Sequence, residues 1–371
     1  MQYSFSELIE EVNEKNTSLK YGIEDIVGVT IEKGIIPTIA NLSQTALDKF
    51  YIVKPGTFIY NPRTHGVRIG MGYNDTECTY ITSWNDVAFK VKEEAKQIVN
   101  PMYLWMYFLR SEWDRETNYY AMGSSTIVFL WSTFQKLKIE LPSIEKQNII
   151  VRQYEVLQNR IQLKKQINDN LLATSQAIFK SWFVDFQPFE GECPSFWRNG
   201  CVEDIAEFYD SMRKPLSSLE RADMEKVYPY YGAVSIVDYV DDYLFDGEYL
   251  LVSEDGIYVV DENGHPLLQH ITGKFWANNH AHILKGKAGF TEDSLYLFLA
   301  NTNMAPIVTG AAQPKINQAN LKSFPLVIPD SETLSKFNAL IELFFDQRLS
   351  NVAEIKELEA LKELLLSQLT H

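Results

Sequence analysis

The chain contains 371 residues, of which 46% are hydrophobic and 13% aromatic, so it carries enough apolar material for two cores and is not a disordered chain. Its formal charge of −15 argues against tight DNA binding by the isolated chain, although a local basic face can exist beside a net acidic charge. No apolar run reaches the roughly 20 residues that span a membrane, and three cysteines without CxxC spacing favour reduced thiols in a cytoplasmic protein.

The first predicted part covers residues 1–142 and mixes strands with helices. A short acidic helix is expected at 6–14, and the run 101–110 predicts an amphipathic helix that begins at Pro101, where proline is tolerated. Apolar runs bounded by turn residues predict strands at 26–31, 50–53, 57–60, 67–71, 87–91 and 138–142. This mixture indicates the α+β class and leaves the strand order open.

A long helix is predicted over residues 143–186. No Gly or Pro lies between Ser143 and Gln187, so nothing interrupts roughly 60 Å of helix. Apolar residues recur at spacings of three and four that place them on one stripe, namely Ile150, Tyr154, Leu157, Leu171, Ile178 and Trp182. This stripe predicts a helix that is buried along one side.

The same pattern returns 187 positions later. The stripe maps onto Phe337, Ile341, Phe344, Leu358, Leu365 and Leu369. The same offset carries Gly123 onto Gly310 and Pro142 onto Pro329. The sequence therefore predicts a tandem duplication, with a second α+β domain at 187–329 and a second long helix at 330–371. Within the second domain, strands are expected at 237–240, 248–252, 257–260, 280–284 and 324–329, and a helix at 293–300.

The two helices are too apolar to face water, so we expect them to pack on each other as an antiparallel coiled coil. Pairing of each helix with another chain remains an alternative. Asn168 falls on the stripe and either fixes the register as a buried amide or lies exposed at a helix edge. The second helix is expected to end freely, so that lengthening the first helix alone would separate the two domains.

Motifs for chemistry are absent from the sequence. Asn61-Pro62-Arg63-Thr64 lacks the aromatic residue that an adenine methyltransferase needs to stack on a flipped base, and no Gly-rich cofactor turn or phosphate loop is present. His280 and His282 alternate on a predicted strand and would face the same side, but no ligand stands beside them at metal spacing. We therefore predict no catalytic residue and no metal site in this chain.

Basic and amide side chains gather at turns in both domains. Arg can bond guanine, Asn and Gln can bond adenine, and Lys neutralises phosphate. The first-domain candidates for DNA contact are Arg63, Thr64, His65, Arg68, Ser124 and Ser125. The second-domain candidates are Lys274, Asn278, Asn279, Lys285, Lys287, Gln313 and Lys315. The alternative reading of each is a solvated surface side chain, because residues 190–329 carry 20 acidic against 10 basic groups.

Several stretches resemble the specificity subunits of type I restriction–modification enzymes. They are Trp276-Ala277-Asn278-Asn279-His280-Ala281-His282-Ile283-Leu284, Gly310-Ala311-Ala312-Gln313-Pro314-Lys315-Ile316-Asn317, Phe324-Pro325-Leu326-Val327-Ile328-Pro329 and Ser181-Trp182-Phe183-Val184-Asp185-Phe186. The resemblance extends over the whole chain through its repeated order of globular part and helix, although the first loop, Gly123-Ser124-Ser125-Thr126, lacks the Gln of the second.

The resemblance implies two target-recognition domains, each reading one half of a split double-stranded DNA sequence, with the helices as a pseudo-twofold coiled-coil spacer. It implies two modification subunits that bind S-adenosylmethionine and methylate adenine, and restriction subunits that use ATP and Mg. This chain itself would hold no cofactor and perform no catalysis. The alternatives are a coiled-coil adapter that does not touch DNA and a catalytic nuclease or methyltransferase chain.

Overall fold

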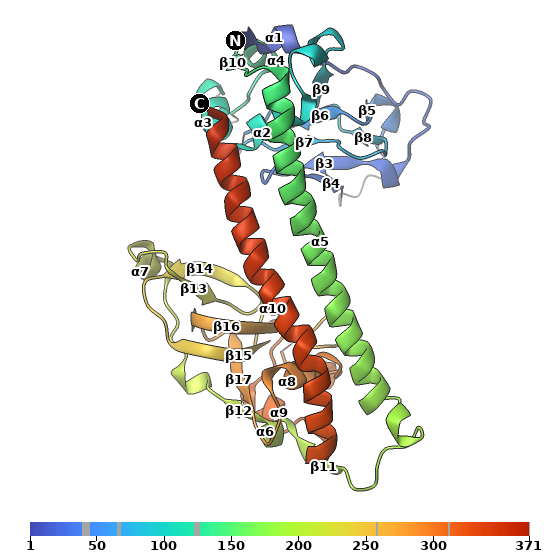
Figure 1. The fold of residues 1–371 in the computed structure, drawn as a ribbon, viewed down its shortest axis with the longest axis vertical. Coiled ribbons are helices and arrows are strands. Elements are labelled where there is room, and N and C mark those ends of the chain that lie inside the picture. Colours follow the sequence, from blue (N-terminus) through green and yellow to red (C-terminus); the bar gives the residue numbers. More distant parts are fainter. Residues whose placement is uncertain (39–44, 65–67, 122–126, 257–258, 311, 371) are drawn as a thin grey trace. The chain divides into compact units, whose positions relative to one another are not determined.

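The computed structural model describes residues 1–38, 45–64, 68–121, 127–256, 259–310 and 312–370. The chain divides into two compact units, the first made of Met1–Gln162 with Lys356–His371 and the second of Leu163–Ile355. Two long helices, α5 (Ile144–Phe183) and α10 (Ser331–Ser367), each contribute residues to both units (Figure 1). No helix in the described part of the chain is both long and apolar enough to cross a membrane.

Besides its parts of α5 and α10, the first unit contains short antiparallel strand pairs and four α-helices among its described residues. The largest sheet has the order β2-β9-β6-β7, and the other pairs are β1-β10, β3-β4 and β5-β8. The strands are β1 (Gln2–Ser4), β2 (Ile9–Glu11), β3 (Val27–Val29), β4 (Ile35–Pro37), β5 (Tyr51–Val53), β6 (Thr57–Tyr60), β7 (Met71–Tyr73), β8 (Tyr80–Thr82), β9 (Val87–Val91) and β10 (Lys138–Glu140). The helices are α1 (Phe5–Leu8), α2 (Pro101–Leu109), α3 (Ser111–Tyr120) and α4 (Trp131–Phe134), with 3-10 turns at Ile23–Asp25, Leu47–Lys49, Glu94–Gln97 and Gln368–Thr370.

The predicted helix at 6–14 is wrong over most of its length. Helix α1 ends at Leu8, and Ile9–Glu11 forms β2, which pairs with β9 in the register Ile9↔Val91. Burial decides the difference, because Ile9 enters the core beside Phe58 and Phe89, which a continued acidic helix would not allow. The predicted helix at 101–110 is confirmed as α2, whose first turn is capped by the Asn100 side chain.

The second unit is built on a six-stranded sheet of order β12-β17-β15-β16-β13-β14, with β11-β18 as a separate antiparallel pair. Within the sheet only β13 and β16 run parallel among the described strands. The strands are β11 (Arg198–Cys201), β12 (Ala206–Phe208), β13 (Tyr228–Tyr231), β14 (Ile236–Val240), β15 (Phe245–Ser253), β16 (Leu268–Ala277), β17 (Ala281–Gly286) and β18 (Pro325–Ile328). The helices are α6 (Val202–Ile205), α7 (Ser218–Ala222), α8 (Glu292–Ala300) and α9 (Gln318–Lys322), with 3-10 turns at Gln187–Phe189, Asp210–Met212 (η5) and Ala305–Ile307.

Five of the predicted elements of the second domain are observed with shifted ends. They are β14, β15, β17, β18 and α8. The predicted strand at 257–260 is not, because residues 257 and 258 lie outside the described residues and Val260 forms only an isolated bridge with Pro266. Strand β16 was not predicted, although it is the central partner of β15. Gly273 and Lys274 interrupt its apolar alternation, and its pairing with β15 is a long-range contact.

The two long helices pack antiparallel within each unit. In the second unit, Lys164 pairs with Glu354 at 2.7 Å, and one turn further Asn168 Nδ2 donates to the carbonyl of Arg348 at 3.3 Å. Asn168 also accepts a hydrogen bond from Asn351 at 2.8 Å, and Asn351 is buried. The Asn168 side chain is therefore half-buried and hydrogen-bonded to the other helix. This favours the prediction that Asn168 fixes the register of the helix pair over the prediction that it is exposed.

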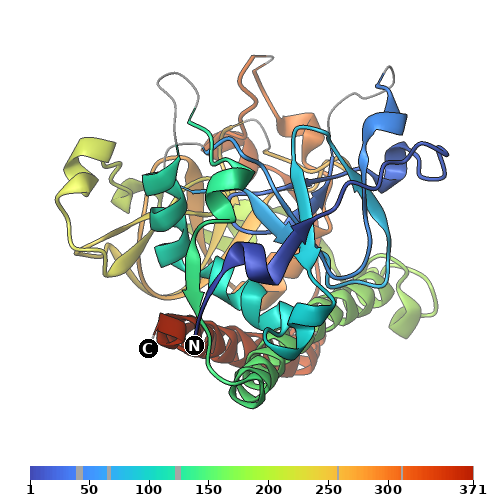
Figure 2. The same ribbon diagram turned by 90° about the horizontal axis from the view of Figure 1, so that it is seen from above.

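In the first unit, the end of α10 belongs to the core. Leu366 and Leu369 pack with Val151 and Tyr154 of α5 in the same cluster as the aromatic core, so the predicted free end of the second helix is wrong. The N-terminus lies beside this end of α10 in both views (Figures 1 and 2), and Met1 lines one groove together with Leu369. Both long helices are therefore anchored at both of their ends.

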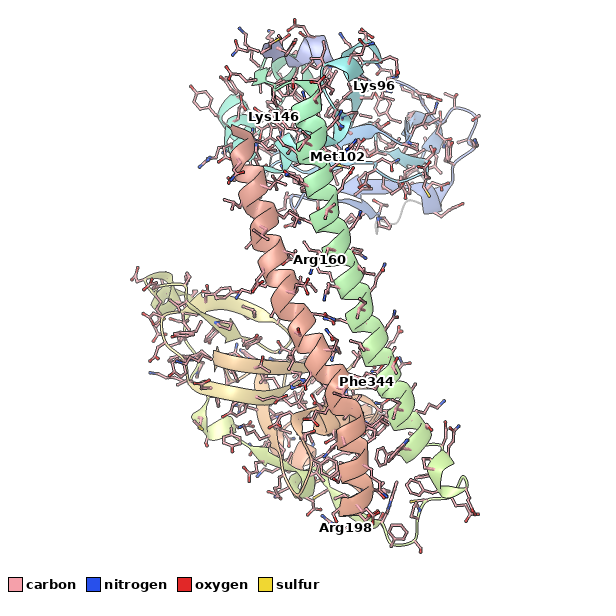
Figure 3. The ribbon with its side chains drawn as sticks, in the orientation of Figure 1. Lys96, Met102, Lys146, Arg160, Arg198 and Phe344 are labelled. Atoms are coloured by element: carbon pink, nitrogen blue, oxygen red, sulfur yellow. The ribbon has the colours of Figure 1, made fainter. Side chains whose placement is uncertain are left out.

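All twelve stripe residues are withdrawn from solvent to some degree. Tyr154, Phe337, Ile341, Leu358 and Leu369 are buried, and the half-buried members are Ile150, Leu157, Leu171, Ile178, Trp182, Phe344 and Leu365. Figure 3 shows Phe344 on α10. Gln147, a polar residue that is not part of the predicted apolar stripe, fixes the start of α5. The buried Gln147 side chain donates to the carbonyls of Ile98 and Pro142, both at 2.9 Å, and accepts from the Asn100 amide.

Candidate nucleic-acid interface

In the first unit, the predicted contact residues lie on the turn that leaves β6. Arg63 is exposed, and its amide donates to Asn61 Oδ1 at 2.9 Å, which holds the turn in shape. Thr64 lies beneath the turn, with its amide bonded to the carbonyl of Ile127 and its hydroxyl buried without a hydrogen-bond partner among the described residues. The Thr64 side chain therefore does not face solvent, which corrects its prediction as a DNA contact. His65, Ser124 and Ser125 lie outside the described residues.

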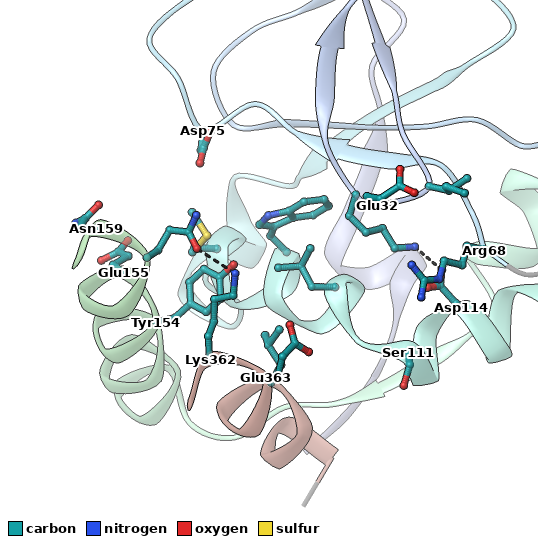
Figure 4. A pocket seen from close by; sticks show the side chains of 17 residues that line it. Glu32, Arg68, Asp75, Ser111, Asp114, Tyr154, Glu155, Asn159, Lys362 and Glu363 are labelled. Carbon is teal, nitrogen blue, oxygen red and sulfur yellow. Dashed lines mark hydrogen bonds and ion pairs between the residues drawn. The ribbon is translucent and has the colours of Figure 1, made fainter. Parts of the chain in front are cut away.

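Arg68 is exposed at the rim of a polar cavity of about 720 Å³ that lies within the first unit (Figure 4). Lys33 and Asp114 form a buried ion pair there, and burial lowers the pKa of Lys33 against the opposing effect of Asp114. The Lys33 ammonium also donates to the carbonyl of Ile69 at 3.0 Å, while Asp114 accepts from the Ile69 amide at 3.3 Å. The pair therefore holds the backbone immediately after Arg68.

In the second unit, the predicted basic residues do not form one patch. The Lys274 ammonium lies 4.4 Å from the ring centre of Tyr243, whereas that of Lys285 lies 4.6 Å from Tyr249, and the two rings belong to different aromatic clusters. Lys287 donates to the carbonyl of Glu203 at 2.7 Å. Lys274 lies on β16 and Lys285 on β17, whereas Lys287 follows the end of β17 and lies outside the sheet.

The structure places the remaining candidates on two connected loops. Thr309 and Lys315 exchange backbone hydrogen bonds of 2.8 Å, which closes a tight loop with Gln313 exposed on it. Gly310 has φ +86°, and a Cβ at this position would meet the Gln313 carbonyl oxygen at 2.4 Å, so the loop requires glycine there. We call the described residues of this segment, 309–310 and 312–315, the Gln313 loop.

The second loop is the turn 278–280, which we call the Asn279 turn. Asn278 is buried, and its side chain accepts from the His280 amide at 2.9 Å, so it shapes the turn instead of facing solvent and its prediction as a DNA contact is corrected. Asn279 is exposed. The two predicted strand histidines do not share a face: His280 is exposed and pairs with Asp255, whereas His282 is fully buried.

A buried polar network, which the sequence did not predict, lies under both loops. His282 Nδ1 lies 2.6 Å from Asp210 Oδ2, and Arg213 bonds Glu254 at 2.5 Å. Burial acts to raise the pKa of both carboxyls, but the hydrogen bonds from His282 to Asp210 and from Lys315 and Arg213 to Glu254 outweigh it, and both pKa values are lowered. Because Arg213 and Lys315 pair with the carboxylates, this group of His, Asp and Glu balances its charge with side chains of its own.

The signals that could have revealed the network were weak. His282 stands in the otherwise apolar run Ala281-His282-Ile283-Leu284, and such a position indicates a satisfied buried histidine. Asp210 begins the turn η5 and Arg213 directly follows it, and this spacing of three residues resembles an ordinary surface pair. Only the fold shows that the two segments meet.

A second cluster of His270, Glu248 and Asp293 lies between the sheet and α8. Asp293 Oδ1 is 3.5 Å from His270 Nδ1 and is buried without a hydrogen bond among the described residues, while Glu248 lies 2.6 Å from His270 Nε2. Burial raises the pKa of Asp293 to about 7, with His270 acting against the rise and Glu248 adding to it. The carboxylates of Glu248 and Asp293 face opposite nitrogens of the His270 ring. This arrangement suits a row of hydrogen bonds through the imidazole more than shared coordination of one metal ion.

This cluster gives a pH prediction. The pKa of Asp293 in the folded protein exceeds the ordinary aspartate value of 3.8, so the folded state binds the extra proton and stability should fall as pH rises from about 4 to about 7. Asp293→Asn removes the buried charge and should stabilise the protein at pH 8 by about 1–3 kcal/mol, with little difference at pH 4. Urea unfolding at both pH values measures this, with the exposed Glu262→Gln as the control. Equal effects of Asp293→Asn at both pH values would contradict it.

Comparison with known proteins identifies the family. Residues 10–173 and 194–360 each match the family described as the type I restriction modification DNA specificity domain. This chain belongs to the family of type I restriction–modification specificity subunits. Specificity subunits supply DNA recognition and are the non-catalytic component of these systems.

Individual relatives carry the same description. A chain described as a type I restriction enzyme specificity subunit in Haemophilus influenzae is 37% identical over 128 residues, which cover 34% of this chain and 32% of that protein. The MjaIX specificity subunit of Methanocaldococcus jannaschii is 24% identical over 274 residues, which cover 67% and 63%. The matched parts span less than two thirds of either relative. The crystal structure of a type I S subunit from M. genitalium covers 100% of this chain and 95% of its own, with a TM-score of 0.57 at 14% identity, and it supports the fold.

Proposed function

We propose that this chain recognises a bipartite double-stranded DNA sequence, with each globular unit reading one half. The observation that carries the proposal is the repetition of the specificity domain at 10–173 and 194–360. Each copy offers exposed side chains suited to DNA on a constrained turn. These are Arg63 and Arg68 in the first unit, and Asn279, Gln313 and Lys315 in the second.

The proposed assembly contains two modification subunits and, in a restricting system, restriction subunits. S-adenosylmethionine, ATP and Mg would bind to these partners, and this chain would hold none of them. The acidic balance of the second domain is compatible with this, because partners can bring much of the basic surface that holds the duplex. A cytoplasmic location follows from the same assignment.

The deciding experiment is salt-dependent protection of DNA by the complex of this chain with its modification subunit, together with mapping of the methylated sites. We expect protection and methylation at one discontinuous sequence, and no methylation or cleavage by the purified chain alone. Assembly without sequence-specific protection would favour the adapter alternative. Methylation by the chain alone would favour the catalytic alternative.

Arg63 provides a test of the division into half-sites. If its side chain reads a base, Arg63→Ala should cost about 1–3 kcal/mol of binding and relax preference in one half-site only. If it contacts phosphate, binding to all sequences should weaken and the salt slope should drop by about one. Competition binding at several salt concentrations separates the two results. If neither the base preference nor the salt slope changes, Arg63 is a surface charge that does not contact DNA.

Lys315 tests the other half-site in the same way. Its ammonium is partly exposed and pairs with Glu254 at 2.9 Å, so one side of the group remains available to a phosphate. Lys315→Met should therefore weaken binding to all sequences and reduce the salt slope by about one. Lys54→Met is the matched control, because Lys54 also pairs with a glutamate but is not a predicted contact.

A further inference from the structure

The Gln313 loop and the Asn279 turn are joined through one segment of the second unit. The Glu254 amide donates to the carbonyl of His280 at 2.9 Å, and the Ile316 amide donates to the carbonyl of Glu254 at 2.9 Å. The side chain of Asp255 bonds His280 at 2.6 Å. A displacement of residues 254–255 would therefore move both loops together.

Arg213 holds this segment from below. Its guanidinium donates to the carbonyl of Ala281 at 2.7 Å and to Glu254 Oε2 at 2.5 Å, and it approaches the carbonyl of Asn279 at 3.4 Å. It also lies 3.3 Å from Asp210 Oδ2. The side chain is only 13% exposed, and all of these partners are acceptors that a planar guanidinium can bridge at once.

His282 and Gln318 complete the hydrogen-bond network beneath the two loops. His282 bonds Asp210 at 2.6 Å on one side and the carbonyl of Ile316, directly after the Gln313 loop, at 2.8 Å on the other. Gln318 donates to Asp210 at 2.8 Å from the first residue of α9. Asp210 also accepts from the Ile283 amide at 2.9 Å, so one carboxylate links η5, β17 and α9.

We propose that Arg213, anchored by Asp210 and Glu254, is a positioning residue that determines the specificity of the second half-site without contacting DNA. The proposal rests on the proposed function, since it concerns the residues that would read that half-site. Readout of DNA bases depends on donors and acceptors held within fractions of an ångström. If Arg213 no longer bridges its acceptors beneath the two loops, the loops should be held less rigidly and discrimination between DNA bases should fall.

The test is Arg213→Lys in the full chain, assembled with its modification subunit and assayed on DNA carrying single base changes in each half of the mapped target. Lysine keeps the positive charge and loses the planar fork. We expect about tenfold or greater loss of discrimination at second-half positions, unchanged discrimination in the first half, and an unchanged salt slope. Arg221→Lys is the matched control, because Arg221 is also 13% exposed and pairs at 2.9 Å with Asp238 on β14, which contributes residues to neither loop.

The outcomes separate this proposal from the proposed function. Absence of a bipartite preference in the parent complex would overturn the proposed function itself. A parent that reads both halves, with an Arg213→Lys variant whose discrimination is intact or no worse than that of Arg221→Lys, would overturn the positioning role alone. A uniform loss on all DNA with a lower salt slope would also overturn it, since Arg213 would then be a phosphate contact. If Arg213→Lys does not unfold cooperatively, Asp210→Asn takes its place with the same expected result, because it keeps the side-chain shape, removes a charge that anchors Arg213 and leaves Glu254 paired with Lys315.

Discussion

Inserting four helix-forming residues into both long helices, after Gln162 and after Ile355, should lengthen the gap between the two recognised half-sites by about two base pairs. Four residues add about 6 Å of helix and about 40° of rotation beyond one turn, and two base pairs add roughly 6.8 Å. The insertion points are the boundaries between the two compact units, so contacts inside each unit are retained. Mapping of methylated sites for the parent and the variant measures the gap.

The insertion must be made in both helices because both are anchored twice. Leu366 of α10 and Leu369 in the 3-10 turn directly after it pack into the first core, and Leu334 and Phe337 near the start of α10 pack into the second. If the second helix ended freely, lengthening α5 alone would be tolerated. Because α10 is anchored at both ends, this single insertion should instead shift one helix against the other and break the hydrogen bonds around Asn351. We expect that single insertion to lower stability and lose activity. A double insertion with full activity and an unchanged gap would show that the helices do not set the spacing.

Phe337→Ala should destabilise the second unit by about 3–5 kcal/mol, since it deletes a fully buried aromatic ring and leaves a cavity. The ring centre of Phe337 lies 4.8 Å from that of Phe183 and 5.9 Å from that of Trp182, both on α5. The loss should therefore also loosen the packing of the two helices in that unit. Hydrogen exchange of the full chain should show faster exchange in the second unit, with the first-unit core protected.

Leu343→Ala is the matched control on the same helix. Leu343 is 72% exposed, so its truncation should change the free energy of unfolding by no more than about 0.5 kcal/mol. Similar effects of the two substitutions in urea unfolding would contradict the assignment of Phe337 to the core. They would also mean that the stripe residues do not hold α5 and α10 together.

Only some of the residues predicted to contact DNA are exposed in the structure. The predicted DNA-contact residues that the structure leaves exposed include Arg63, Arg68, Lys274, Asn279 and Gln313, and they were identified from residue type and turn context alone. Thr64 and Asn278 were predicted on the same grounds and are buried, because short polar side chains beside a turn are as often used to shape it as to face solvent. Residue type indicates what a side chain can bond, whereas its direction depends on the strand that carries it.

The class of the domains, the repetition of the chain and the two long helices can be predicted from the sequence. These features follow from local chemistry: apolar spacing of three and four, the absence of Gly and Pro over 144–186, and turn residues at strand ends. Features that depend on pairing over long distances became visible in the folded chain, namely the sheet order, the anchoring of Leu369 in the first core and the network of Asp210 with His282, 72 positions apart. A buried charge is stable only beside its partner, and partners brought together by folding leave no periodic trace in the chain.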